Sequence, residues 1–88
     1  MSRSVWKYQV PLKKSSHTFE MPGEGPKAIQ LGSQAGVPCV WVEVDPDSAH
    51  RTLRTYSWFG TGWLIPLSAI HLGTLQSGEL VFHLYQVD

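Results

Sequence analysis

The sequence predicts an all-β fold, a small antiparallel barrel or sandwich of six or seven short strands, on three observations. Helix signals are scarce, because Gly or Pro interrupts nearly every window long enough to hold three helical turns. Apolar and polar residues alternate with a period of two in several short runs, which is typical of half-buried strands. Turns containing Gly separate these runs at spacings of roughly ten residues. The 88 residues make a single domain, 1–88, because they are too few for two independent cores.

The first half of the chain supplies the clearest strands. In VWKYQV the apolar Trp6, Tyr8 and Val10 alternate with polar residues, and in HTFEM two apolar residues share one face. A hairpin follows, whose turn contains a Gly that supplies positive φ. Its second strand, CVWVEV, has large apolar side chains on both faces and is therefore expected to be central in its sheet. The predicted ranges are 5–10 and 17–21 for the strands and 28–44 for the hairpin, with its turn at 34–36.

The second half begins with a turn or a single helical turn at 45–51, where Asp, Ser and Pro cluster. A strand is predicted over 52–60, and a short helical turn over 66–70, because Pro is well suited to the first position of a helix. A final hairpin, 71–87, turns at Ser77 and Gly78.

Charge and composition exclude several classes of function. Seven basic and seven acidic residues cancel, so the broad positive field needed for binding long nucleic acids is absent. No apolar run approaches the ~20 residues of a membrane-spanning helix, and the N-terminus lacks the apolar region of a secretory signal. The chain has one cysteine, which excludes an internal disulfide framework and favours a reducing, cytoplasmic location.

No pattern of catalytic or metal-binding residues is present in the sequence. The acidic residues form no acid and base pair, and the four histidines lack the spacing of a metal site. Cys39 is expected to be a buried free thiol, since no basic residue lies near it in sequence. We therefore predict no enzymatic activity, no metal and no cofactor. The alternative is an enzyme assembled across strands, for which His71 and His83 are the candidates if they meet in space.

A candidate binding site surrounds the stretch FGTGWLIP. The Gly-Thr-Gly triplet is either a tight turn that covers the core or a loop that brings backbone N–H groups close to a ligand. On the preceding strand, Arg54, Tyr56 and Trp58 share one face. We expect this face either to contact another chain or to stack a planar ligand whose phosphate pairs with an arginine. The predicted ligand-binding residues are Arg51, Arg54, Tyr56, Trp58, Gly60, Thr61, Gly62 and Trp63.

The chain resembles a family of short, uncharacterised proteins of tailed bacteriophages and prophages. The resemblance rests on WKYQVPL (6–12), TFEMPGEG (18–25), GVPCVWVEVDP (36–46), FGTGWLIP (59–66) and HLGTLQSGELVFHLY (71–85). It implies a phage setting and the host cytoplasm, and it supplies no catalytic residues.

In that setting we expect a non-enzymatic counter-defence protein that binds and sequesters a nucleotide-derived immune signal. The alternatives are an inhibitor that binds a host protein complex, in the manner of anti-CRISPR proteins, and a small structural or regulatory accessory protein. A homo-oligomer is also expected, because six large aromatic residues exceed what one small core can enclose. They are Trp6, Tyr8, Trp41, Tyr56, Trp58 and Trp63.

Overall fold

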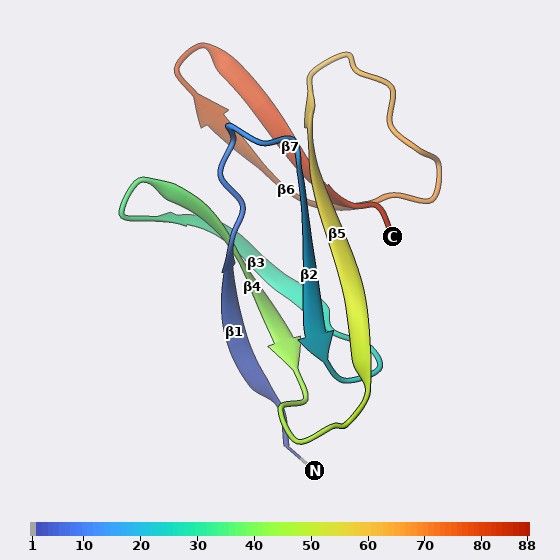
Figure 1. The fold of residues 1–88 in the computed structure, drawn as a ribbon. Coiled ribbons are helices and arrows are strands. Elements are labelled where there is room, and N and C mark those ends of the chain that lie inside the picture. The colour runs from blue at the N-terminus through green and yellow to red at the C-terminus, as the bar shows by residue number, and fades with distance from the viewer. Residues whose placement is uncertain (1) are drawn as a thin grey trace.

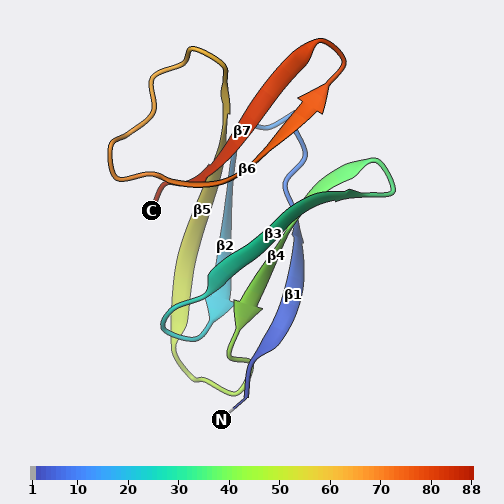
Figure 2. The same cartoon turned by 180° about the vertical axis from the view of Figure 1, so that it is seen from behind.

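Seven antiparallel strands form two sheets in the computed structural model, which describes residues 2–88 (Figures 1 and 2). One sheet has the order β1-β4-β3 and the other the order β2-β5-β7-β6. The all-β prediction is confirmed, and the two separate sheets make the fold a sandwich. The strands are β1 (Ser4–Gln9), β2 (Ser16–Pro22), β3 (Lys27–Gln34), β4 (Val37–Val44), β5 (Arg51–Gly60), β6 (Ile70–Ser77) and β7 (Leu80–Gln86).

Strand β4 is central in its sheet, as its sequence predicts, because β1 and β3 pair with its two edges. Its Val40, Val42 and Val44 are buried and face the second sheet, while Trp41 and Glu43 lie on the outer face. From the second sheet, β2, β5 and β7 contribute the large core side chains. The buried hydrophobic cluster consists of Val10, Met21, Val40, Val42, Val44, Tyr56, Trp58 and Leu84.

The turns agree with the sequence except at one place. Ala35 and Gly36 have φ values of 52° and 78° in the β3–β4 turn, and Gly78 has a φ of 62° in the β6–β7 turn. The helical turn predicted at 66–70 is wrong, because no helix occurs between residues 2 and 88. Instead the Ala69 N–H donates to the Pro66 carbonyl at 3.1 Å. A single turn of helix is unfavourable because it fixes several dihedral angles for one hydrogen bond. Here the chain continues directly into β6, so no further helical turn follows to offset that cost.

The hydroxyl of Tyr56 is buried without a hydrogen-bond partner among the described residues. Burial, the largest cause, raises the pKa of Tyr56 to about 12, because the charged phenolate is disfavoured away from water. The unfolded phenol ionises near pH 10. The folded pKa lies above the unfolded value, so the contribution of Tyr56 to stability is complete below pH 10 and is lost as the pH rises toward 12.

We expect Tyr56→Phe to leave the free energy of unfolding at pH 7 unchanged or slightly higher, because the hydroxyl that it removes has no partner. Between pH 10 and 12 the wild type should lose stability relative to this variant by up to about 1.4 kcal/mol per pH unit. Urea unfolding of both proteins at pH 7, 10 and 11 measures the difference. A loss of more than about 1 kcal/mol at pH 7 would show that the hydroxyl has a stabilising partner.

Candidate functional site

The aromatic part of the predicted site lies in the core. Tyr56 is fully buried, and Trp58, only 4% exposed, donates its indole N–H to the Val10 carbonyl at 2.9 Å. These two side chains do share one face of β5, but that face packs against the other sheet. The expectation that they present an exposed surface to a ligand or to another chain is therefore wrong. The physical reason is that this face buries more aromatic area between the sheets than the opposite face of β5 would.

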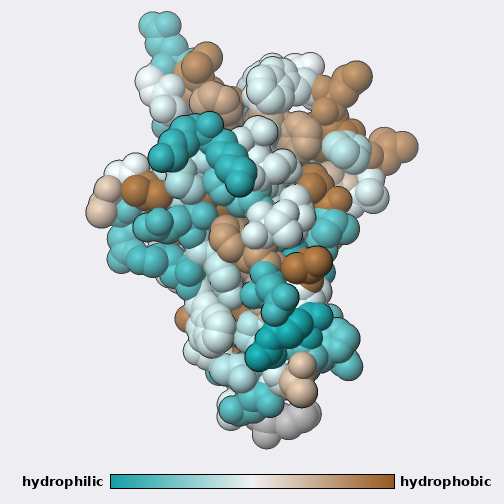
Figure 3. Space-filling model, viewed as in Figure 1, coloured by the Kyte–Doolittle hydropathy of each residue, from teal (hydrophilic) through white to brown (hydrophobic). Residues whose placement is uncertain are grey.

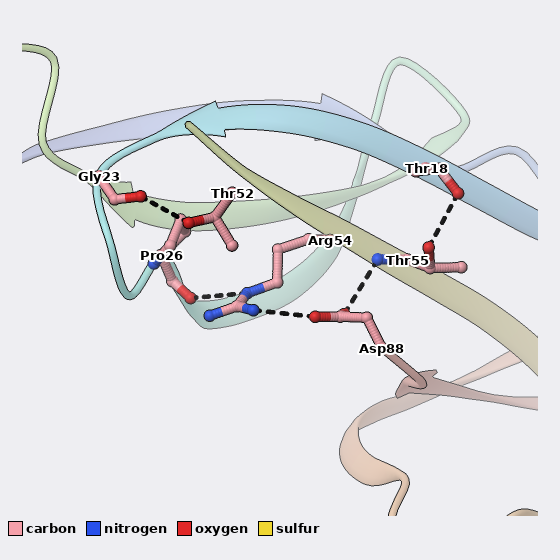
Figure 4. A network of polar contacts seen from close by, with 7 residues as sticks. All are labelled: Thr18, Gly23, Pro26, Thr52, Arg54, Thr55 and Asp88. Atoms are coloured by element: carbon pink, nitrogen blue, oxygen red, sulfur yellow. Dashed lines mark hydrogen bonds and ion pairs between the residues drawn. The ribbon is translucent and has the colours of Figure 1, made fainter. Parts of the chain in front are cut away.

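Arg54 also belongs to the inner face, where its guanidinium is already paired (Figure 4). Its NH1 group donates to the Asp88 carboxylate at 2.9 Å, and its Nε donates to the Pro26 carbonyl at 3.2 Å. The other oxygen of Asp88 accepts the Thr55 backbone N–H at 3.0 Å. This arrangement ties the end of the chain and the β2–β3 connection to β5, so Arg54 is a structural residue in this conformation.

Arg51 lies at the opposite end of β5 from the Gly-Thr-Gly triplet. A strand rises about 3.3 Å per residue, so roughly 30 Å separates Arg51 from Gly60. The Arg51 guanidinium donates to the carbonyls of Ser48 and His50 at 2.7 and 3.2 Å. The eight predicted site residues therefore do not converge on one small ligand.

The Gly-Thr-Gly triplet forms a tight turn. The Trp63 N–H donates to the Gly60 carbonyl at 3.1 Å, and Gly62 has a φ of 89°, which favours glycine. The Trp63 indole folds back over Gly60, where an added Cβ would lie 2.9 Å from the ring. Of the two alternatives that the sequence left open, the turn is formed, although Trp63 remains 59% exposed and does not cover the core.

An exposed apolar loop follows this turn. We use the name apolar loop for residues 61–70, which comprise the connection between β5 and β6 and the first residue of β6, Ile70. The connection stands out from the sandwich as an open arch (Figures 1 and 2). Leu64 is 96% exposed, Leu67 is fully exposed, and Ile70 and Trp63 are each more than half exposed. Hydrophobic groups stand out over this loop at the upper right of the space-filling view (Figure 3). Contiguous exposed apolar side chains of this kind mark interaction sites.

A chain of hydrogen bonds joins the two ends of the apolar loop on the outer face of the four-stranded sheet. Thr61 Oγ1, at the start of the loop, lies 3.1 Å from His83 Nε2. His83 Nδ1 lies 2.9 Å from Thr74 Oγ1, and His71 Nε2, just after the loop, lies 3.2 Å from the same oxygen. His71 and His83 therefore do meet, with ring centroids 6.4 Å apart.

This network is better suited to holding the loop than to catalysis. Both ring nitrogens of His83 face threonine hydroxyls, so neither is free to bind a metal. No group of three or more His, Cys, Asp or Glu side chains arranged for a metal ion occurs within residues 2–88. The absence of catalysis stays a prediction.

Sequence reasoning missed Leu64, Leu67, Ile70 and Thr74. The available signal was the apolar run WLIPL immediately after a turn, because such runs are unusual in exposed loops. A similar run also occurs in buried strands, so the sequence does not distinguish the two cases. Among the described residues, no helix is long and apolar enough to cross a membrane.

Comparison with known proteins finds one family. A family model described as Domain of unknown function (DUF7352) matches residues 1–88. No curated protein matches the chain, and no solved structure matches it.

Proposed function

Because the chain belongs to the family described as Domain of unknown function (DUF7352), we propose a function from its geometry: it is a non-catalytic binding protein that docks on another protein through the apolar loop. The observation that carries this proposal is the exposure of Trp63, Leu64, Leu67 and Ile70 in the apolar loop. Such side chains gain roughly 1.5–3 kcal/mol each when a partner covers them fully.

The composition of the apolar loop supports a protein partner. Residues 61–70 read TGWLIPLSAI and carry no charge. Surface helices and segments that bind anionic membranes combine apolar residues with Lys or Arg, and nucleic-acid contacts depend on the same cations. An uncharged, apolar projection instead fits an apolar pocket on a protein, and a tryptophan is a frequent anchor in such pockets.

The anchoring of the loop also supports docking. Two turns shape it, through the bonds Trp63 N–H to Gly60 and Ala69 N–H to Pro66, and His83 fixes its base through Thr61. A loop that is held in one shape before binding loses less conformational entropy on binding.

The phage resemblance of the sequence supplies the biological setting of the proposal. In that setting the partner is a host protein complex in the cytoplasm, and the protein is an inhibitor of host defence that acts by occupying a surface. Its balanced charge, seven basic and seven acidic residues, does not support mimicry of DNA.

Sequestration of a nucleotide-derived immune signal is the second candidate. Its support is the exposed ring of Trp63 beside a hollow whose lining includes Gly60, Thr61 and Phe82, where a base could stack. Glu79 is the charged residue in that lining, and a carboxylate repels phosphate. The first candidate is therefore the stronger.

A photo-crosslinking experiment tests the proposal. A benzophenone amino acid replaces Leu67 in the apolar loop or, as the matched control, Leu53, which is 61% exposed on the outer face of β5. We expect position 67 to cross-link to one host protein in bacterial extract and position 53 not to do so. Equal labelling at both positions, or labelling at neither, would contradict docking through the loop. Calorimetry with cyclic and ADP-ribose-type nucleotides tests the second candidate, for which measurable heat is the supporting result.

A further inference from the structure

The free edge of β1 carries a second interaction surface, separate from the apolar loop. Within residues 2–88, β1 pairs only with β4, and it lies at the lateral margin of the molecule in both ribbon views (Figures 1 and 2). Trp6 is 41% exposed and Val5 48% exposed, although they point to opposite faces of the sheet. Apolar side chains on both faces of an unpaired edge strand are a liability that proteins usually cover.

The hydrogen-bond pattern of β1 shows which backbone groups are free. The Val10 N–H donates to the Pro38 carbonyl at 2.9 Å, so residues 10, 8, 6 and 4 direct their backbone groups toward β4. In an antiparallel ladder the alternate residues point the other way. Val5, Lys7 and Gln9 therefore direct their N–H and C=O groups to the free edge.

We propose that the partner on this edge is a second copy of the same chain, with β1 paired to β1 across a two-fold axis that passes beside Trp6. The two Trp6 side chains then stand directly opposite each other as a non-hydrogen-bonded pair, with Cα atoms about 4.5 Å apart. Val5 of each copy exchanges two backbone hydrogen bonds with Lys7 of the other. The two three-stranded sheets become one continuous sheet.

Charge favours this register over the two adjacent registers, whose two-fold axes would pass beside Lys7 or Val5. An axis at Lys7 would place the two copies of Lys7 in directly opposed positions, and an axis at Val5 would place Arg3 opposite Lys7. Like charges in directly opposed positions destabilise a sheet, whereas aromatic pairs stabilise it. The Lys7 ammonium donates to Gln34 Oε1 on β3, and because β4 lies between β1 and β3, the charge is directed away from the free edge.

The other edge strands are less suited to pairing. β3 has an irregular register between Ala28 and Gln30, and β6 has one between His71 and Gly73. Such bulges twist an edge away from further strands. β2 has a charged residue, Glu20, on its outer face and ends in Pro22.

Sedimentation of the purified full chain tests the proposal. The concentration should reach about 100 µM, because a dimer with a small interface dissociates at lower concentrations. We expect a wild-type dimer. Lys7→Pro removes an N–H that points away from β4, so the fold should remain. The dissociation constant of the dimer should rise at least tenfold, because this N–H donates across the interface. Lys7→Ala is the matched control, because it removes the ammonium and keeps the N–H, and it should remain dimeric.

Cross-linking tests the position of the axis. Trp6→Cys should form a covalent dimer on mild oxidation, because the paired Cα atoms would lie within disulfide range, and Glu20→Cys on β2 should not. The native Cys39 is fully buried and should not interfere. A wild-type monomer at every concentration, or a dimer unaffected by Lys7→Pro, would overturn the proposal. A dimer that is lost only in Leu64→Asp would also overturn it and would assign self-association to the apolar loop.

Discussion

Trp58→Ala is expected to lower the free energy of unfolding by about 3–5 kcal/mol, the range for removing a large aromatic side chain from a core. Trp58 is 4% exposed between the two sheets, and its indole N–H satisfies the Val10 carbonyl. A small domain has a total stability of about 5–15 kcal/mol, so the variant should be partly unfolded at 25 °C or close to it. Urea unfolding followed by circular dichroism measures the loss.

Trp63→Ala is the matched control for this prediction. It removes the same side chain from a position that is 59% exposed, so its effect on stability should stay below about 1 kcal/mol. If Trp58 faced a ligand, as the sequence suggested, the two variants would be equally stable. Equal stability would therefore contradict the burial of the Arg54, Tyr56 and Trp58 face.

Gly73→Ala is expected to cost about 1–3 kcal/mol, as overpacking of a well-packed contact does. A Cβ at Gly73 would lie 2.7 Å from Leu31 Cδ2 and 2.9 Å from Leu31 Cβ. Leu31 packs against the hydrophobic core, and the contact joins β6 to β3 across the two sheets. The Cβ of Leu31 is attached to the backbone, so rotation of its side chain does not relieve the clash.

Two further variants separate overpacking from other effects. Gly25→Ala is the control, because an added Cβ meets nothing within 4 Å there, and it should be close to neutral. The double variant Leu31→Ala with Gly73→Ala should lose less stability than the two single variants combined, since the smaller residue 31 makes room for the new methyl group. Simple additivity would rule out a direct clash with Leu31.

The sequence predicted the pairing and core of β4 well, because its alternation leaves few alternatives. Val40, Val42 and Val44 on one face and Trp41 on the other predict a strand in the centre of its sheet, and in the structure β4 is paired along both edges, with its valines buried.

For β5 the same reasoning was insufficient. Alternation identifies the residues that share a face, but it does not say which face meets the core. Phe59 and Leu53 made the opposite face of β5 almost as apolar as the face of Tyr56 and Trp58. The choice between them depends on the second sheet, which local sequence does not describe.

The contact between His71 and His83 could not be predicted from the sequence for a different reason. The register of β6 against β7 shifts between His71 and Gly73, after which Thr74 pairs with His83. A bulge adds one residue to one strand. Gly73 lies at this shift, and an isolated glycine in a strand can mark a bulge, but it does not specify which residues pair after it. The hydrogen-bonded base of the apolar loop therefore became visible only in three dimensions.

The affinity of the host protein cross-linked at position 67 for two charged variants tests the central claim most directly. Leu64→Asp with Leu67→Asp places carboxylates on the tip of the apolar loop, and Leu53→Asp places one on an exposed leucine outside it. If the apolar loop is the docking surface, the loop variant should bind at least about 30-fold more weakly, which corresponds to a loss of about 2 kcal/mol at an interface hot spot, and Leu53→Asp should bind as the wild type does. Wild-type affinity in the loop variant, or an equal loss in both variants, would contradict the claim.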